Sequence, residues 1–507
     1  MIVSSKKTFF NTLLLVSSLL FFSNMFADEI SYSLSMPKPS THYFHVQMIV
    51  SKIPTKMLEV QMPAWTPGVM SITDFARYII DVNAYSSDHQ KLPFHKIDKQ
   101  TWQIENGHYS SVMIDYQVYA SSQPATNTSS LTNNSGFING TSVFMYVVNG
   151  KDSQSNLTVN VPQGWQILSA AGKLGQHQFT FSNYDLLADH SIQLGKFYST
   201  PFNTDKTHDY LSVTGDYTQQ SIKLLLHETQ LIEKTAESML PLIDTKHYTN
   251  FFQFIPNIKD PDGLEHLDDF LIIDNQPLTS HDGKSLDNTI DGYPLMWVIA
   301  HEFVHRWNVK RLRPANLGPF DYSKEVYTHS FWFVEGATSY IGDLILLKSG
   351  LWSKQDFYNH MSQQMTLLNK SRGQFVRSME QASFDIWLKD QKGGPFWNSV
   401  WSDPHIKGEL ICWMMDLSIR HLTHNKKNFL DFFNLFYNRM YVQAKPDSYY
   451  LKGRGYTTQD IVQALQDTTQ TDWHEFFKKN IASPGQIAYG YYLQYAKDSQ
   501  RCGVRCI

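Results

Sequence analysis

The chain has few cysteines, and this scarcity excludes one class of protein. Only three occur in 507 residues, at Cys412, Cys502 and Cys506. Three cysteines cannot form the dense disulfide framework of a small secreted scaffold, and none of them supports a metal site on its own. Cys412 stands in an apolar run of helical period, which predicts an inert thiol in the core. The sequence leaves open whether Cys502 and Cys506 pair.

A strong net charge and long apolar runs are also lacking. The formal net charge is −4, so nucleic acid and anionic membrane surfaces are not expected partners. No segment of the mature chain reaches the roughly 20 apolar residues of a membrane span. At the N-terminus, Lys6 and Lys7 precede an interrupted apolar run from Phe9 to Phe22. This pattern predicts a signal peptide over residues 1–27, and therefore a periplasmic or secreted protein.

Length and hydrophobic period predict an α+β protein of more than one domain. The chain is too long for one ordinary core. Residues 28–200 show a period of two, for example in Phe44–Val50, Val112–Val118 and Leu157–Val161, with turn-rich segments such as Thr126–Gly140 between such runs. This predicts an N-terminal antiparallel β domain of sandwich type. Residues 201–495 are expected to form an α-rich domain with a small sheet, and residues 496–507 a tail.

The helical period begins after about residue 215. The predicted helices are Gln220–Leu240, Pro294–Asn308, His329–Lys348, Lys407–Leu422, Asn428–Tyr441 and Thr457–Leu465, and a strand is predicted at Phe270–Ile273. No long proline- or glycine-rich linker marks the boundary near residue 200, so its position follows from the change of period alone.

The stretch HEFVH, residues 301–305, is the first sign of chemistry. Because a helix turns once in 3.6 residues, His301 and His305 lie on one face and can offer two imidazoles to one tetrahedral ion. Glu302 is one step away and is placed as a general base for a metal-activated water. Burying two histidines and a glutamate in so apolar a helix without a metal would be costly. The sequence therefore favours a zinc site over a purely structural helix.

A third ligand is expected in the later segment THSFWFVEGATSYIGDL. Glu335 is the one acid in its apolar first half, and a carboxylate there needs a partner, which zinc would supply. Two histidines and a glutamate leave one coordination position open. This arrangement is typical of catalytic rather than structural zinc.

Several segments together resemble the glycyl aminopeptidase family of gluzincin zinc peptidases. HEFVHRWNVKRLRP and WFVEGATSY resemble the family's zinc-binding segments. Further similar segments occur in the expected order: MPAWTPGVMSITDFARY, DKQTW, GLEH, ASFDIWLK and IKGELICWMMDLSIR. The resemblance spans about residues 30–495.

The resemblance implies an N-terminal β domain, a thermolysin-like catalytic domain and removal of small N-terminal residues, such as Gly or Ala, from peptides. It also implies that His301, His305 and Glu335 hold one zinc ion and that Glu302 is the base. The GLEH segment makes Gly263 and Glu265 the predicted substrate-binding residues. A carboxylate at Glu265 would pair with the free amine of a peptide and reject internal segments.

Two features depart from the family pattern. The family usually places a tyrosine two residues before the Lys-Gly of its catalytic helix, where the hydroxyl donates to the oxyanion, but here DPHIKG has His405. A protonated imidazole can donate the same hydrogen bond, and His405 is therefore the predicted second catalytic residue. After Tyr495 too few residues remain for the PDZ-like domain that many relatives carry, so that domain is expected to be absent.

The predicted function is a zinc aminopeptidase that acts on peptides with a free N-terminus. Two alternatives remain open. One is a thermolysin-like endopeptidase, favoured by a histidine donor at position 405, although this class has an aspartate where the chain has Ser339. The other is a weakly active or inactive zinc-binding homologue, because the usual tyrosine is missing.

Overall fold

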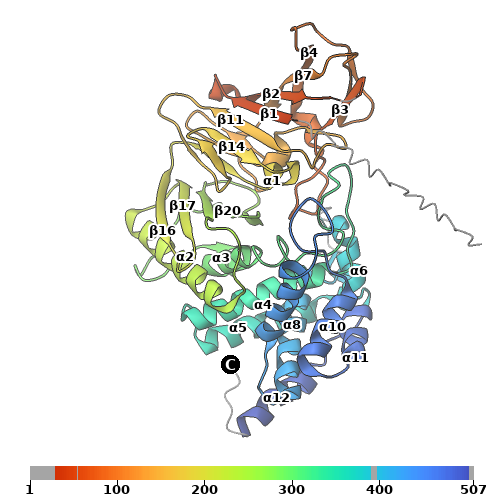
Figure 1. The fold of residues 1–507 in the computed structure, drawn as a ribbon. Helices are drawn as coiled ribbons and strands as arrows, with labels where there is room; N and C mark the ends of the chain where they lie inside the picture. The colour runs from red at the N-terminus through yellow and green to blue at the C-terminus, as the bar shows by residue number, and fades with distance from the viewer. Residues whose placement is uncertain (1–28, 54, 390–396, 502–507) are drawn as a thin grey trace, which may run out of the picture.

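The structure, a computed structural model, describes residues 29–53, 55–389 and 397–501. Sheets gather at one end of the molecule and helices at the other, with a five-stranded sheet between them (Figure 1). The predicted signal peptide and the pair Cys502 and Cys506 lie outside the described residues. Within the described ranges, no helix is both long and apolar enough to cross a membrane.

Three sheets form the N-terminal part. The largest has the order β13-β14-β11-β1-β2-β7-β4 (Lys173–Gly175, Gln178–Phe181, Ser155–Asn160, Glu29–Ser35, Tyr43–Ser51, Ser111–Tyr119, Ile79–Ser86). The second is β10-β3-β6-β5 (Tyr146–Val147, Met57–Gln61, Thr101–Glu105, Phe94–Lys96), and the third is β12-β15-β9-β8 (Gln166–Leu168, Ile192–Gly195, Ser135–Ile138, Ser130–Leu131). The predicted alternation is confirmed in β2, where every second residue from Phe44 to Val50 is fully buried.

A mixed sheet follows in the chain and carries part of the site. Its order is β16-β17-β18-β20-β19 (Tyr198–Asn203, His208–Gly215, Thr249–Phe254, Asp269–Asp274, Asp262–Glu265). β17, β18 and β20 are parallel and β19 runs antiparallel to β20 at the edge. The predicted strand at Phe270–Ile273 is thus confirmed as the middle of β20. A short pair, β21 and β22 (Thr289–Ile290, Tyr293–Pro294), leads into the first helix of the site.

Helices make up most of the remainder. They are α1 (Tyr184–Ala188), α2 (Gln219–Met239), α3 (Leu295–Val304), α4 (Phe331–Ser349), α5 (Lys354–Lys370), α6 (Met379–Phe384), α7 (Trp397–Val400), α8 (Pro404–Leu422), α9 (Phe429–Tyr437), α10 (Thr458–Thr469), α11 (His474–Phe477) and α12 (Tyr489–Arg501). The six predicted helices are present with shifted ends, and Cys412 is a buried free thiol of α8, as predicted. The helix predicted to reach Asn308 ends at Val304, because the backbone bonds that follow change register: Arg306 N–H donates to the Phe303 carbonyl and Trp307 N–H to the Val304 carbonyl.

Two glycines let α4 and α8 cross at close range beside the site. A Cβ atom on Gly336 would lie 2.2 Å from the carbonyl carbon of Gly408, and one on Gly408 would lie 2.3 Å from the carbonyl oxygen of Trp332. Both contacts are with backbone, which cannot move aside as a flexible side chain can. The crossing places Glu335 of α4 against the first turn of α8.

Replacing Gly408 with alanine is expected to destabilise the protein by about 1–3 kcal/mol, because the added methyl forces the two helices apart. The measurement is the melting temperature of the purified variant. Gly490→Ala in α12 is the matched control, since its added Cβ would meet no atom within 4 Å. If both variants have the melting temperature of the wild type, α4 and α8 do not pack as closely as described.

Candidate functional site

Helix α3 brings two imidazoles together. His301 lies in its last turn and His305 directly follows its end, and the two Nε2 atoms are 3.1 Å apart. Both side chains are buried. The helix is apolar on all sides, so it is embedded in the core rather than laid on it, and this fixes the direction of both rings.

Glu335 of α4 completes the group. Its Oε2 atom lies 3.3 Å from His301 Nε2 and 3.5 Å from His305 Nε2. Donor atoms held about 2.0–2.1 Å from a tetrahedral ion stand about 3.3 Å from one another, so these three fit one zinc ion. Burial alone would raise the pKa of Glu335, but His405 and His305 lower it well below its ordinary value. The carboxyl is therefore ionised, as a ligand must be.

The far nitrogens of both imidazoles have partners of their own. His305 Nδ1 donates to the carbonyl oxygen of Asn308 at 2.7 Å, and His301 Nδ1 lies 3.2 Å from the Ser339 hydroxyl. With the proton on Nδ1, each ring turns the lone pair of Nε2 toward the common point. Ser339 thus orients the His301 ring, as a carboxylate orients the ligand histidine in many zinc sites.

Glu302 lies beside this group and against the edge strand. A Cβ atom on Gly263 of β19 would be 2.3 Å from Glu302 Oε1, so the absence of a side chain there lets the carboxylate fit. Burial raises the pKa of Glu302 well above its ordinary value, His305 opposes this shift, and Glu265 adds to it. A carboxylate of raised pKa is a better proton acceptor near neutral pH.

Glu265, at the end of β19, faces the same point. Single donor atoms of Glu265, Glu302 and His305 all lie within 4.8 Å of one another. Glu265 is buried, yet its carboxylate has no hydrogen bond or ion pair with any residue that the structure describes. Gly68 in its left-handed conformation lies close by, since a Cβ atom there would be 2.8 Å from Glu265 Oε2. Glu265 also lines a cavity, so a cationic ligand in that cavity can pair with its carboxylate.

A small cavity adjoins Glu265 and Glu335. Its volume is 20 Å³, which holds roughly one water molecule. The apolar walls include Met70, Val309, Leu317, Phe331, Val334 and Tyr450.

His405 lies at the start of α8. Asp403 caps the helix by accepting from the His405 backbone N–H at 2.9 Å, and Pro404 occupies the first turn. The His405 ring is about one-third exposed, with Nε2 3.3 Å from Glu335 Oε2 and Nδ1 3.3 Å from Asp403 Oδ1. The structure thus brings together all seven residues that the sequence singled out: His301, Glu302, His305, Glu335, Glu265, Gly263 and His405.

A second buried polar group supports His301 from behind. The Trp297 ring stacks on the His301 ring at 5.2 Å, and its indole N–H donates to Asp343 at 2.8 Å. Asp343 lies next to His360 and Glu409, whose side chains are 2.7 Å apart. No local pattern in the sequence marks this group, because its members come from four helices and share no motif.

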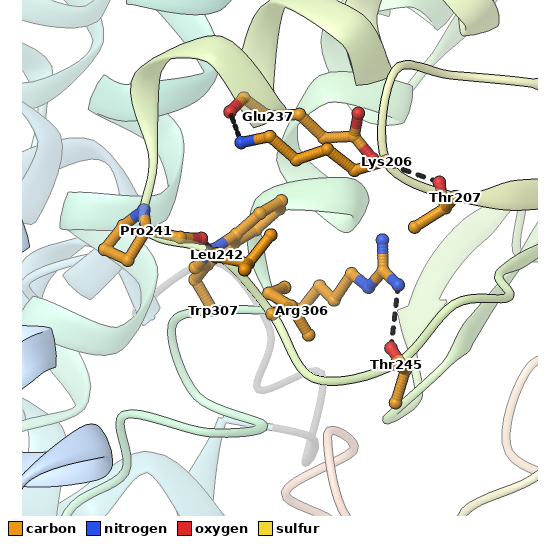
Figure 2. Close-up of a pocket in the computed structure, with 9 residues that line it drawn as sticks. Lys206, Thr207, Glu237, Pro241, Leu242, Thr245, Arg306 and Trp307 are labelled. Atoms are coloured by element: carbon orange, nitrogen blue, oxygen red, sulfur yellow. Dashed lines mark hydrogen bonds between the residues drawn. The ribbon is translucent and has the colours of Figure 1, made fainter.

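The segment after His305 is anchored away from the site (Figure 2). Arg306 donates to Thr245 Oγ1 at 2.8 Å, and Trp307 Nε1 donates to the carbonyl oxygen of Pro241 at 2.8 Å. These residues line a cavity of only 10 Å³. The two hydrogen bonds hold the segment after α3 in place.

Family models match both halves of the chain. Residues 31–196 match the peptidase M61 N-terminal domain, and residues 294–411 match the M61 glycyl aminopeptidase. Together these matches cover more than half of the sequence. The chain belongs to the M61 glycyl aminopeptidase family. The resemblance predicted from the sequence is therefore confirmed, and family membership identifies the protein as a peptidase, a hydrolase.

Solved structures show the same fold. An aminopeptidase N family protein from Idiomarina loihiensis is 24% identical, with a TM-score of 0.81 over 92% of this chain and 78% of that chain. An M1 zinc metallopeptidase from Deinococcus radiodurans is 11% identical, with a TM-score of 0.52 over 87% and 90% of the two chains. Yeast LTA4 hydrolase is 13% identical, with a TM-score of 0.52 over 91% and 68%. No curated protein matches the chain. The predicted α+β class of this M61 protein is confirmed.

Proposed function

We propose that this M61 peptidase is a zinc aminopeptidase in which His301, His305 and Glu335 hold one ion. The observation that carries the proposal is the pairing of two features at one point. Three buried donor atoms converge at 3.1–3.5 Å, and the carboxylate of Glu265 lies beside them with no hydrogen bond or ion pair to any residue that the structure describes. The first feature suits a zinc ion and the second suits a substrate ammonium.

Glu302 is the proposed general base. A bound zinc ion would supply Lewis acidity that polarises the scissile carbonyl and makes water a stronger acid. Glu302 then accepts the proton of the attacking water at its carboxylate and passes it to the leaving amine. Gly263 leaves room for this carboxylate, and the edge strand β19 keeps it in place.

Glu265 is the proposed recognition group for the free N-terminus. Its single carboxylate can pair with an α-ammonium, whereas an internal peptide nitrogen carries no charge to offer. Carboxylate oxygens of Glu265 and Glu302 lie within 4.8 Å of each other, so the α-amine and the first carbonyl of a peptide can be bound at the same time. Cleavage would then release one residue from the end of the chain.

The size of the cavity beside Glu265 leads to a prediction about substrate preference. Since 20 Å³ holds roughly one water, a methyl side chain fits there and a larger one requires rearrangement. We expect zinc-loaded protein to hydrolyse Gly- and Ala-anilides with kcat/KM at least about tenfold above that of Leu- and Phe-anilides. Parallel assays of the four substrates test this, and a preference for Phe would contradict the assignment of the cavity.

His405 is the proposed donor to the oxyanion. Its Nε2 atom is turned toward the site, and Asp403 orients the ring from the other side. We expect His405→Phe to lower kcat by about 10²-fold while zinc binding persists, because one donor to the developing charge is lost. Zinc content by mass spectrometry and kcat for Ala-anilide should be measured on the same sample. A variant with wild-type kcat would exclude this role.

A thermolysin-like endopeptidase is the second candidate, favoured by the histidine at position 405. A fluorogenic peptide blocked at both ends separates the two, since an endopeptidase cleaves it internally and an aminopeptidase does not. If His405→Tyr hydrolyses either substrate while the wild-type protein hydrolyses neither, the protein is instead a weakly active or inactive zinc-binding homologue.

A further inference from the structure

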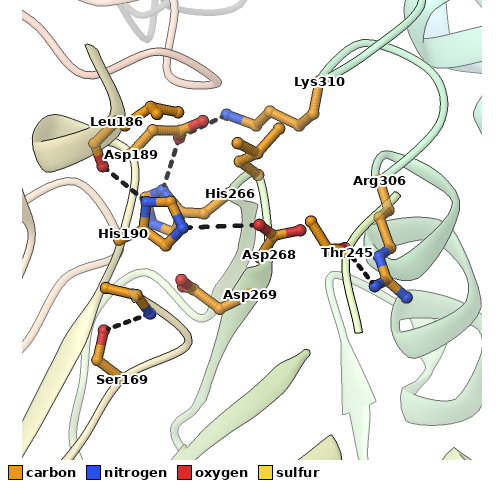
Figure 3. Close-up of polar contacts among 12 residues, drawn as sticks. Ser169, Leu186, Asp189, His190, Thr245, His266, Asp268, Asp269, Arg306 and Lys310 are labelled. Carbon is orange, nitrogen blue, oxygen red and sulfur yellow. Dashed lines mark hydrogen bonds and ion pairs between the residues drawn. The ribbon is translucent and has the colours of Figure 1, made fainter. Parts of the chain in front are cut away.

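A buried cluster of charged residues, most of them labelled in Figure 3, adjoins Glu265: His266 follows Glu265 in the chain, and Lys310 lines the same cavity as Glu265. It forms where the segment after α1 meets the ends of β19 and β20 and the loop after α3. Its members are Asp189, His190, His266, Asp268, Lys310 and Arg311, and each is less than a tenth exposed. Buried charges at such density are retained only where each has a suitable partner.

Lys310 stands between two carboxylates of this region. Its Nζ atom donates to Asp189 Oδ1 at 2.9 Å, and it lines the same small cavity as Glu265. Burial would lower the pKa of Lys310, but Asp189 and then Glu265 raise it, so the ammonium stays charged. Lys310 and Glu265 are both among the described residues, and no ion pair joins them.

Asp189 is itself held firmly. It closes the end of α1, where its backbone N–H donates to the carbonyl oxygen of Asp185 at 3.0 Å, and its Oδ1 also lies 3.1 Å from His266 Nδ1. The neighbouring His190 Nδ1 donates to the Leu186 carbonyl oxygen at 2.6 Å. The carboxylate that holds Lys310 is therefore fixed by contacts independent of Lys310.

An ammonium so near Glu265 poses a problem for substrate binding. A lysine stem is flexible and its head is a compact charge, so Lys310 released from Asp189 would pair with Glu265. That pair would occupy the place of the substrate's α-ammonium. The structure avoids it because Asp189 supplies the nearer and better-fixed partner.

We propose that Asp189 is a positioning residue that holds Lys310 away from Glu265 and so keeps the Glu265 carboxylate free for a peptide's α-ammonium. This inference rests on the proposed aminopeptidase function. It adds that a residue of the segment after α1, far from the zinc ligands in sequence, sets the affinity for free amines.

The test compares KM and kcat for Ala-anilide in zinc-loaded full-length variants. Asp189→Asn keeps the shape but removes the charge, so Lys310 turns to Glu265 and KM is expected to rise about tenfold or more, with kcat changed less than about threefold. The double variant Asp189→Asn/Lys310→Met removes the competing ammonium, and its KM is expected to return to within about threefold of the wild type. A merely structural role of Asp189 predicts no such rescue.

Asp268→Asn is the matched control, because Asp268 belongs to the same cluster but pairs with Arg311 rather than Lys310. It is expected to lower the melting temperature without the rise in KM. A wild-type KM in Asp189→Asn, or a raised KM that persists in the double variant, would overturn the proposal. If Asp189→Asn does not fold, Asp189→Ala and Asp189→Ala/Lys310→Met are compared instead, and the same rise in KM and return toward the wild type are required.

The outcome is separable from that of the proposed function. A wild-type protein that prefers free amines together with an unchanged Asp189→Asn variant rejects the role of Asp189 only. A wild-type protein that treats free and acetylated amines alike rejects both.

Discussion

Glu302→Gln is expected to lower kcat for Ala-anilide by about 10²–10⁴-fold, the usual contribution of a positioned general base. The amide has the same shape as the carboxylate but cannot accept the proton of the attacking water. Because Glu302 is not one of the three proposed zinc ligands, the variant should bind zinc as the wild type does. The measurement is kcat together with zinc content of one preparation.

The corresponding control is Glu475→Gln, at an exposed position of α11 far along the chain from the site. This substitution should leave both kcat and the zinc content unchanged. Equal kcat values in Glu302→Gln and the wild type would remove Glu302 from the mechanism and with it the proposed reaction.

Glu335→Gln is expected to weaken zinc binding by more than about a hundredfold and to abolish activity, since loss of a residue that only hydrogen-bonds to a ligand already costs about 10–100-fold. The substitution removes the anionic donor while leaving two neutral imidazoles. It also removes the carboxylate that stands 3.3 Å from His405 Nε2, so the orientation of that ring should relax.

Zinc affinity by competition with a fluorescent chelator is the direct measurement for Glu335→Gln. Retained stoichiometric zinc at wild-type affinity would mean that another group supplies the third donor. Added zinc should not restore activity at concentrations that saturate the wild type.

The convergence of His301, His305 and Glu335 could be predicted from the sequence because its geometry is local, while the zinc ion itself stays a proposal. The spacing of His301 and His305 follows from one helical turn, and Glu335 was recognisable as an acid in an apolar stretch. The structure places all three donors at one point. The roles assigned to these three residues and to Glu302, Glu265, Gly263 and His405 stay predictions, although all seven lie close together.

Other features depend on distant parts of the chain and could not be read from a local pattern. Asp189 and Lys310 meet only when the segment after α1 packs against the loop after α3. Helix α5 was missed because it is largely polar, with only Phe357, His360, Met361, Gln364 and Leu368 buried. Its one strong local signal is the capping box of Ser353 and Asp356.

The predicted division of the chain at residues 27, 200 and 495 stays a prediction, as do export and the preference for peptide partners over nucleic acid. The change from sheets to helices along the chain agrees with the confirmed fold class. Export can be tested by expressing the chain with residues 1–27 and determining the N-terminus of the mature protein.

The central claim is that Glu265 and the zinc position together select a free N-terminus. The ratio of kcat/KM for Ala-anilide to that for N-acetyl-Ala-anilide, measured on zinc-loaded wild-type protein, tests it most directly. We predict a ratio of at least about 10², because acetylation removes the charge that a buried carboxylate binds. A ratio near one, or faster hydrolysis of the acetylated substrate, would contradict the account.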